Sequence, residues 1–280
     1  MKPNFLIIGA ARAGTTSLFQ YLENHPDVFM SEVKELNFFS NPTFWKKGTK
    51  WYEENFKKAT QKAVGEASTS YTRHPSNPDV AERIFGYNPE MKLIYILRDP
   101  VDRFISHYLH RVTRGQETRS LDELFQGTLD DPLFWQGKYH YQLREYLRYF
   151  SQSNIHIVTI DQLKNQPTAT VESLFNFLSV TPQIDDSKLS QHHNANSRVT
   201  QKSTFGMAVL SFYHKYIEQR PFPYRLKRRF LKLAEFGSKT VSNTSLSASQ
   251  HKKLVELYQP DVEKLKHDFG VDTKHWKNFN

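Results

Sequence analysis

The chain has 280 residues, enough for one sizeable domain that buries roughly three quarters of its unfolded surface. Aromatic residues make up 14% of it, including 21 Phe and 14 Tyr, so a core is readily built and wholesale disorder is excluded. The sequence contains 0 cysteines, which excludes disulfides, zinc–thiolate sites and cysteine nucleophiles and fits a reducing compartment.

The charge balance predicts an anionic partner. Lys and Arg number 38 against 29 Asp and Glu, a net charge of +9, which suits a nucleotide, an acidic polymer, an acidic carrier protein or a membrane surface. A generally basic surface is the plain alternative. No apolar run approaches the roughly 18 residues of a membrane span, and the first apolar segment leads into a glycine loop rather than a signal-peptide cleavage site. We therefore expect a cytoplasmic protein without a transmembrane segment.

Near its start the chain predicts a strand, a tight glycine loop and a helix. Four apolar residues, 5–8, run into Gly9, which is typical of a strand buried on both faces of a parallel sheet. Leu18, Phe19 and Leu22 follow at helical spacing. In that arrangement the loop N–H groups and the helix N-terminus point at one spot, which attracts phosphate or sulfate.

The loop has the glycine spacing of a P-loop without its lysine. Gly9 and Gly14 have four residues between them, but Thr15 stands where the lysine should be. That lysine reaches the terminal phosphates of a nucleoside triphosphate, so its absence argues against ATP or GTP hydrolysis. Arg12 supplies a different cation inside the loop. The site therefore suits a phosphate-bearing ligand other than ATP, although an ordinary strand-to-helix turn would need the same glycines.

Further strands and helices alternate along the chain. Residues 91–97 and 155–160 read as two more buried strands, with shorter extended segments at 28–29 and 64–71. Helices are predicted at Asp79–Phe85, Val101–Leu109, Leu121–Phe125, Tyr139–Phe150, Pro167–Leu178 and Gln250–Phe269. This alternation over residues 4–180 predicts a single α/β domain, 1–280, with a central parallel sheet flanked by helices on both faces and a C-terminal loop and helical part, 181–280.

The strand at 91–97 ends at a segment with two possible roles. Asp99 could imitate the magnesium-binding aspartate of P-loop ATPases, but its neighbours suit a turn with Asp99 near a helix N-cap and Pro100 early in the helix. Arg98 and Ser106 lie at the strand's carboxyl end and about two turns into the helix. Because ligands of open parallel sheets bind outside the carboxyl ends of the strands, both can face the side of the glycine loop.

Glu35 precedes the Phe38–Phe39 pair. It is either a surface charge beside a core anchor or, if the pair is buried, a base held at a pocket edge.

The C-terminal third is less regular. His192 and His193 lie in a polar loop, and adjacent side chains on an extended chain point to opposite sides, so no shared metal is expected. The segment 205–236 combines aromatics with Arg225, Lys227, Arg228, Arg229 and Lys232. It could be a membrane-surface helix, an acceptor-binding wall or a basic amphipathic helix.

Three segments together resemble one enzyme family. The loop 9–17, the segment 35–39 and the run 97–106 are similar to those of sulfotransferases that use 3′-phosphoadenosine-5′-phosphosulfate (PAPS), closest to the heparan sulfate sulfotransferase branch and its bacterial relatives. The resemblance spans Phe5 to Trp276 and implies a P-loop-like fold. It also implies an EC 2.8.2-type reaction that moves a sulfuryl group from PAPS to a hydroxyl or amine and leaves 3′-phosphoadenosine-5′-phosphate (PAP), with no metal.

The resemblance also implies roles for individual residues. Glu35 matches the general base, and Arg98 and Ser106 match the pair that grips the 3′-phosphate. The residues implied to surround the 5′-phosphate and sulfate are Arg12, Ala13, Gly14, Thr15, Thr16 and Ser17, of which Arg12 also has a catalytic role. The loop implied to close over the nucleotide contributes Ser197, Arg198 and Lys202.

Two departures from the family pattern concern the cation and the acceptor. Arg12 stands where the family often has lysine, which keeps the charge and changes its geometry. Ala67 follows Glu66 where the glycan-modifying branch commonly has lysine, which favours a bacterial-type substrate. The acceptor is left open among a glycan, a lipid, a small metabolite and an acyl chain on a carrier protein, and no nucleic acid is expected.

Two rival functions fit parts of the sequence. A P-loop kinase or NTPase needs the missing loop lysine and a magnesium aspartate, for which only Asp99 is available. A non-enzymatic polyanion- or nucleic-acid-binding protein is suggested by the net charge of +9 and the segment 205–236. The basic residues, however, are dispersed along the chain, and the motifs point to a nucleotide site.

Overall fold

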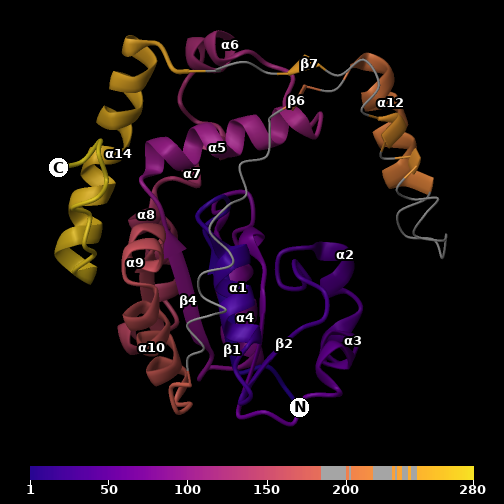
Figure 1. Ribbon diagram of the computed structural model, residues 1–280, viewed down its shortest axis with the longest axis vertical. Helices are drawn as coiled ribbons and strands as arrows, with labels where there is room; N and C mark the ends of the chain where they lie inside the picture. The colour runs from indigo at the N-terminus through magenta and orange to yellow at the C-terminus, as the bar shows by residue number, and fades with distance from the viewer. Residues whose placement is uncertain (184–199, 202, 217–228, 231, 235–238, 241–244) are drawn as a thin grey trace. The chain divides into compact units, whose positions relative to one another are not determined.

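The computed structural model describes residues 1–183, 200–201, 203–216, 229–230, 232–234, 239–240 and 245–280 (Figure 1). These residues fall into two compact units. The α/β unit comprises 1–104, 130–194 and 251–280, and the second unit comprises 105–129 and 195–250.

A five-stranded parallel sheet forms the centre of the α/β unit. Its strands are β1 (Phe5–Gly9), β2 (Val28–Met30), β3 (Ala63–Ala67), β4 (Lys92–Leu97) and β5 (Ile155–Thr159), in the order β2-β3-β1-β4-β5. All four pairings are parallel, with Phe5 opposite Gly65 on one side and Lys92 on the other. Every residue of β1 and β3 is buried, as expected for strands covered on both faces. The α/β architecture predicted from the sequence is therefore confirmed.

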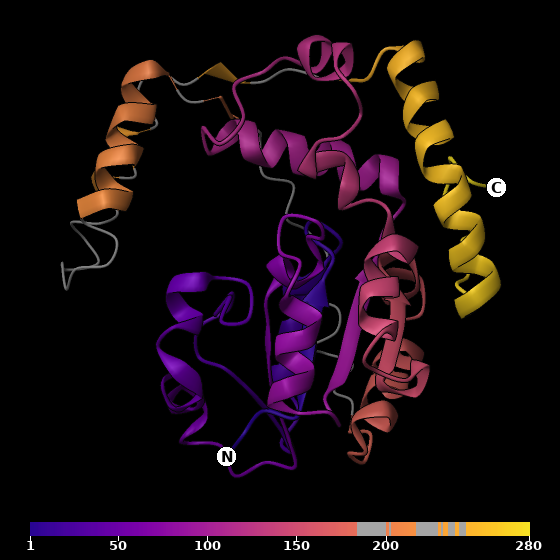
Figure 2. The same cartoon turned by 180° about the vertical axis from the view of Figure 1, so that it is seen from behind.

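Helices cover both faces of the sheet, as the ribbon seen from behind also shows (Figure 2). The helices of this unit are α1 (Thr15–Glu23), α2 (Pro42–Trp45), α3 (Gly48–Glu53), α4 (Val80–Tyr87), α7 (Pro132–Trp135), α8 (Tyr139–Leu147), α9 (Ile160–Asn165), α10 (Pro167–Leu178) and α14 (Ala248–Phe269). One core cluster joins Ile7 and Ile94 of the sheet to Leu18 of α1 and Leu174 of α10. Side chains of a strand alternate between its faces, so Tyr95 faces the other way, where its ring meets that of Tyr139 in α8 at 5.9 Å.

Most predicted elements are present, with small shifts at their ends. The helix predicted over 139–150 ends at Leu147, and the closing helix, predicted from Gln250, begins at Ala248. Helix α9 was not predicted. Its N-cap is Thr159, the last residue of β5, which forms a capping box with Gln162. One residue therefore ends the strand and caps the helix.

The second unit contains most of α5 (Pro100–Thr113), which begins in the α/β unit, together with α6 (Leu121–Gln126) and α12 (Thr204–Tyr216). A capping box between Ser120 and Glu123 starts α6, which confirms the short helix predicted there. A two-stranded antiparallel sheet pairs β6 (Thr200–Gln201) with β7 (Lys239–Thr240). Arg225, Lys227 and Arg228 lie outside the described residues.

In the part of the chain that the structure describes, none of the helices is both long and apolar enough to cross a membrane.

Candidate active site

The loop between β1 and α1 has a backbone that only glycine tolerates at two points. Gly14 has φ 101° and Gly9 has φ 149°, in the region that side chains rarely adopt. A Cβ on Gly9 would clash with Thr72 Oγ1, and one on Gly14 would lie 3.2 Å from Ile160. Gly14 occupies the N-cap position of α1 and offers no side-chain cap. The loop therefore presents a helix N-terminus whose N–H groups and dipole favour an anion.

The side chains of this loop differ in how accessible they are. Ala13 is completely buried and Thr15 is 5% exposed, so both fix the loop against the core. Arg12 and Thr16 are exposed, and Ser17 is half-buried. Arg12 has a left-handed backbone, with φ 69°. The predicted loop residues thus occupy one strand-to-helix turn, and the cation that the sequence places there is accessible to a ligand.

The Glu35 segment is anchored to the end of strand β3. The Glu35 N–H donates to the Ala67 carbonyl at 2.8 Å. Phe38 and Phe39 are completely buried, and Phe38 stacks on Tyr52 with ring centroids 4.4 Å apart. The sequence predicted that Glu35 could act as a base only if the Phe pair were buried, and both rings are buried.

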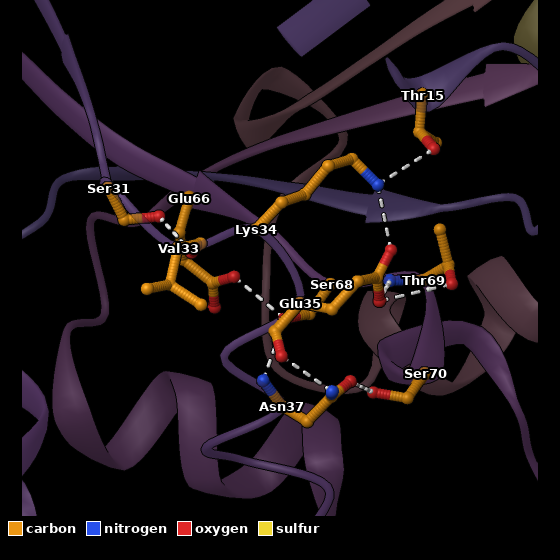
Figure 3. Close-up of polar contacts among 10 residues, drawn as sticks. All are labelled: Thr15, Ser31, Val33, Lys34, Glu35, Asn37, Glu66, Ser68, Thr69 and Ser70. Atoms are coloured by element: carbon orange, nitrogen blue, oxygen red, sulfur yellow. Dashed lines mark hydrogen bonds and ion pairs between the residues drawn. The ribbon is translucent and has the colours of Figure 1, made fainter. Parts of the chain in front are cut away.

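The Glu35 carboxylate accepts hydrogen bonds from two neighbours (Figure 3). Lys34 Nζ donates to Oε1 at 2.8 Å, and Thr69 donates to Oε2 through its N–H at 2.9 Å and its hydroxyl at 3.2 Å. The side chain of Glu35 is 34% exposed. Its carboxylate is thus held in one position and remains reachable from solvent.

Lys34 connects this carboxylate to the glycine loop. Its Nζ lies 2.8 Å from Glu35 Oε1 and 3.4 Å from Thr15 Oγ1, so a single ammonium bridges the first residue of α1 and the candidate base (Figure 3). Sequence reasoning did not identify Lys34. Its adjacency to Glu35 was the available signal, but adjacency alone does not indicate that the side chain turns toward the loop.

A second carboxylate, Glu66 of β3, lies in the interior. Its side chain is completely buried and accepts hydrogen bonds from Ser68 at 2.7 Å, from Tyr52 at 3.4 Å and from Tyr71. Burial raises the pKa of Glu66 to about 7, and the charge of Glu35 adds to this effect while the hydrogen bonds oppose it. The sequence singled out Glu66 only as a family marker, so this buried group is a structural finding.

Ser68 and Asn37 link the buried Glu66 to the Glu35 segment. Ser68 Oγ donates to Glu66 and accepts from the Asn37 N–H at 2.9 Å. Asn37 in turn donates through Nδ2 to the Glu35 carbonyl at 2.7 Å and accepts from Ser70. Both Glu35 and Asn37 have left-handed backbones, with φ 63° and 53°. These bonds hold the segment in a conformation that non-glycine residues seldom adopt.

Arg98 and Ser106 are described in different units. Arg98 follows β4 at the carboxyl end of the sheet, with its side chain 30% exposed and 3.7 Å from Asp102. Ser106 lies in the part of α5 that belongs to the second unit. The grip of these two residues on a 3′-phosphate stays a prediction.

Asp99 caps helix α5, as the sequence indicated. Its Oδ1 accepts from the N–H groups of Val101 and Asp102 at 2.9 and 3.3 Å. Its Oδ2 accepts from the side chain of Asn278 at 2.8 Å. Both oxygens thus serve a structural role, which removes support from its reading as a magnesium ligand.

Several predicted residues lie outside the described residues: His192, His193, Ser197, Arg198 and Lys202. Within the ranges that the structure describes, no three or more His, Asp or Glu side chains are grouped so that they could hold a metal ion.

A parallel α/β sheet with a glycine loop and a helix N-terminus at its carboxyl edge is typical of proteins that bind phosphorylated ligands. Within that class the chain belongs to the sulfotransferase domain family, which matches residues 2–267. The resemblance stated from the motifs is therefore confirmed.

Relatives support the same assignment. The chain is 30% identical over 199 residues to the heparan sulfate glucosamine 3-O-sulfotransferase 5 of Mus musculus, a match covering 67% of this chain and 56% of that one. It is 39% identical over 110 residues to the membrane-associated sulfotransferase kil1 of Dictyostelium discoideum, a match covering 38% of this chain and 22% of that one. The chain thus spans between 22% and 56% of the length of these two relatives.

Solved structures show the same fold. The sulfotransferase from Alicyclobacillus acidocaldarius matches 99% of both chains with a TM-score of 0.68 and 24% identity. Mouse sulfotransferase SULT7A1, crystallised with PAP, matches 96% of this chain and 89% of its own with a TM-score of 0.52 and 12% identity.

Proposed function

We propose that residues 1–280 act as one sulfotransferase domain that moves a sulfuryl group from PAPS to a hydroxyl or amine of an acceptor, with Glu35 as general base. The observation that carries the proposal is the placement of Glu35 beside the glycine loop, joined to Thr15 through Lys34 by contacts of 2.8 and 3.4 Å. Family membership supports the reaction, and the PAP bound to mouse SULT7A1 supports the donor.

The residues present suit in-line transfer. A bond forms between the acceptor oxygen or nitrogen and sulfur, while the bond from sulfur to the 5′-phosphate oxygen breaks and PAP leaves. The acceptor proton passes to Glu35. Loop N–H groups, the N-terminus of α1 and Arg12 stabilise the charge that develops on the leaving phosphate. In this scheme PAPS is the only cofactor, used as a co-substrate.

Glu35 meets the geometric requirements for a base. Hydrogen bonds from Lys34 and Thr69 fix both of its oxygens, and a side-chain exposure of 34% leaves room for an acceptor to approach. General bases of this kind must lie within hydrogen-bond reach of the proton they remove.

The donor site extends beyond the loop in this proposal. Arg98 and Ser106 bind the 3′-phosphate, and Ser197, Arg198 and Lys202 close over the nucleotide. The position of Arg98 at the carboxyl end of the sheet supports its share of this role.

Calorimetric titration tests the donor site. PAP, 5′-AMP, ADP and ATP with magnesium are titrated into the wild type, Arg98→Ala and Arg148→Ala, an exposed arginine paired with Glu145 at 2.9 Å. We expect PAP to bind most tightly. We expect Arg98→Ala to lower the preference for PAP over 5′-AMP, measured as the ratio of their Kd values, by about 10-fold, the value of one charge-assisted hydrogen bond. Arg148→Ala should leave this ratio unchanged. Tightest binding of ATP with magnesium, or no binding at all, would overturn the proposal.

The rival functions gain little from the structure. Asp99 caps α5 with one oxygen and meets Asn278 with the other, which does not favour a kinase or NTPase. Salt-sensitive binding of duplex nucleic acid, without preference for PAP, would favour the polyanion-binding alternative.

For the acceptor we propose only the group that reacts, a hydroxyl or an amine. The mouse relative is named for heparan sulfate glucosamine, which favours a glycan. Ala67 stands where the glycan-modifying branch commonly has lysine, and it is completely buried, so this chain lacks the lysine side chain at that position. A lipid, a metabolite or a carrier-bound acyl chain therefore stands beside a glycan in an acceptor screen with labelled donor. The cytoplasmic location stays a prediction, to be tested by cell fractionation.

A further inference from the structure

The ammonium of Lys34 lies between the two halves of the candidate site. We propose that Lys34 is a catalytic residue that binds the sulfuryl group of the donor and adds a second cation to the one that Arg12 supplies in the loop. This proposal rests on the proposed function, because it needs a donor that carries a sulfuryl group.

The glycine loop contains Arg12 as its cation but has no lysine after its second glycine. A P-loop places a lysine directly after its second glycine, where it reaches the terminal group of the bound nucleotide. This chain has Thr15 at that position, and the Lys34 Nζ lies 3.4 Å from the Thr15 hydroxyl. The ammonium of Lys34 therefore lies beside Thr15, the residue that occupies the position of the P-loop lysine.

Burial shows that Lys34 is held in place. Its side chain is 25% exposed, next to a Glu35 side chain that is 34% exposed. The Lys58–Glu32 pair has a similar distance, 2.7 Å, but both side chains are 69% exposed. A partly buried charge is tolerated only when it is paired, so Lys34 depends on Glu35 in a way that surface lysines such as Lys58 do not depend on their partners.

The ammonium has capacity for another ligand. A lysine has three N–H donors, and the hydrogen bonds of Lys34 in the described part of the chain go to Glu35 and Thr15. A sulfuryl oxygen can take the third. The N-terminus of α1 favours an anion at the same place, so the helix and the lysine attract the same group.

Lys34 also couples the base to the transferring group. As the acceptor–sulfur bond forms and the sulfur–phosphate bond breaks, the acceptor proton moves to Glu35 and neutralises its carboxylate. The attraction between Glu35 and Lys34 then weakens, since one charge of the pair is gone. The lysine charge becomes available to the sulfuryl oxygens and the leaving group at the stage when negative charge develops there.

Comparing two nucleotides isolates this contact without a known acceptor. PAPS carries the sulfuryl group, and PAP lacks it. Both are titrated calorimetrically into the wild type, Lys34→Ala, Lys34→Arg and the control Lys58→Ala. We expect Lys34→Ala to raise the Kd for PAPS by about 10-fold or more, the value of a hydrogen bond to a charged group, and the Kd for PAP by less than about twofold. Lys34→Arg restores part of the PAPS affinity because it keeps the charge.

The outcomes separate this inference from the proposed function. If the wild type binds neither nucleotide, the proposed function itself fails. If the wild type binds both and Lys34→Ala leaves the ratio of the two Kd values unchanged, the role of Lys34 is wrong while the donor assignment stands. An equal effect of Lys58→Ala on that ratio would also overturn the inference, because it would show a general effect of surface charge. Normal PAP binding by Lys34→Ala shows that the variant is folded.

Discussion

Two glutamates near the carboxyl edge of the sheet have opposite environments. Glu35 is one third exposed and pairs with a lysine, whereas Glu66 is completely buried and is surrounded by the hydroxyls of Ser68, Tyr52 and Tyr71. A carboxylate at a rim beside a cation can exchange a proton with a ligand. A buried carboxylate has no ligand within reach, so it gains or loses a proton when the pH changes or the protein unfolds.

The two side chains are nonetheless connected. Glu66 receives a hydrogen bond from Ser68, which accepts one from Asn37, whose side chain donates to the Glu35 carbonyl. Under the proposed function the two glutamates therefore have different roles: Glu35 accepts the acceptor proton, and Glu66 supports the backbone that holds Glu35 in place. Changing one side of this pair, or the link between them, tests these roles.

The largest effect is expected from Glu35→Gln. The change keeps the shape and removes the base, so the sulfuryl transfer rate should fall by about 100- to 10,000-fold, the usual contribution of a general base. It is measured with labelled PAPS and the acceptor found by screening. Calorimetry should give a Kd for PAP close to that of the wild type.

Glu32→Gln is the matched control for this variant. Glu32 lies three residues earlier and also pairs with a lysine, but its side chain is 69% exposed. Its removal should leave turnover unchanged. Near-normal turnover of Glu35→Gln would end the assignment of Glu35 as the base.

The second prediction concerns Glu66 and the pH dependence of stability. Its folded pKa, about 7, lies above the ordinary value of 4.5. Between these values the folded state holds a proton that the unfolded state has released, so the free energy of unfolding should fall as the pH rises from about 4.5 to about 7. The fall amounts to about 3 kcal/mol at most. Below this window the contribution is fully present.

Denaturant unfolding of the wild type and Glu66→Gln at several pH values checks this. Glutamine does not titrate, so the fall should be smaller in the variant by the amount that Glu66 contributes. Glu32→Gln should keep the wild-type slope over this window, because the hydrogen bond from Lys58 lowers the pKa of Glu32 instead of raising it. If the free energy of unfolding depends on pH in the same way in the wild type and in Glu66→Gln, then folding does not raise the pKa of Glu66 and the prediction is wrong.

The sequence predicted the fold well because its signals are local. Apolar runs gave the buried strands, and the glycine spacing gave the turn at Gly9 and Gly14, where φ values of 149° and 101° require glycine. Helix α9 was missed because it is short and its cap, Thr159, is also the last residue of a strand.

The site was predicted less completely because its contacts join distant segments. Thr69 and Lys34 bind the same carboxylate, yet Thr69 is 34 positions from Glu35. The bridge from Lys34 to Thr15 spans 19 positions. Parallel pairing of β2 with β3 and of β3 with β1 brings these segments together, and periodicity does not specify which side chains then meet. The family resemblance supplied Glu35, but the supporting residues Lys34, Asn37 and Ser68 emerged only from the structure.

The smallest effect is expected from cutting the link itself with Ser68→Ala. This change removes one hydrogen bond to Glu66 and one from Asn37, and a hydrogen bond contributes about 1 kcal/mol. We expect turnover to fall by about fivefold as Glu35 loses its fixed position, while the Kd for PAP is unchanged because the glycine loop is untouched. Ser31→Ala is the control: Ser31 is equally buried, and its hydroxyl donates to the Val33 carbonyl at 2.9 Å instead of to Glu66. If both variants lower turnover equally, the loss reflects general packing and the link has no special role. If Ser68→Ala alone lowers turnover and also shifts the pH window of stability, the buried and exposed glutamates work as one unit.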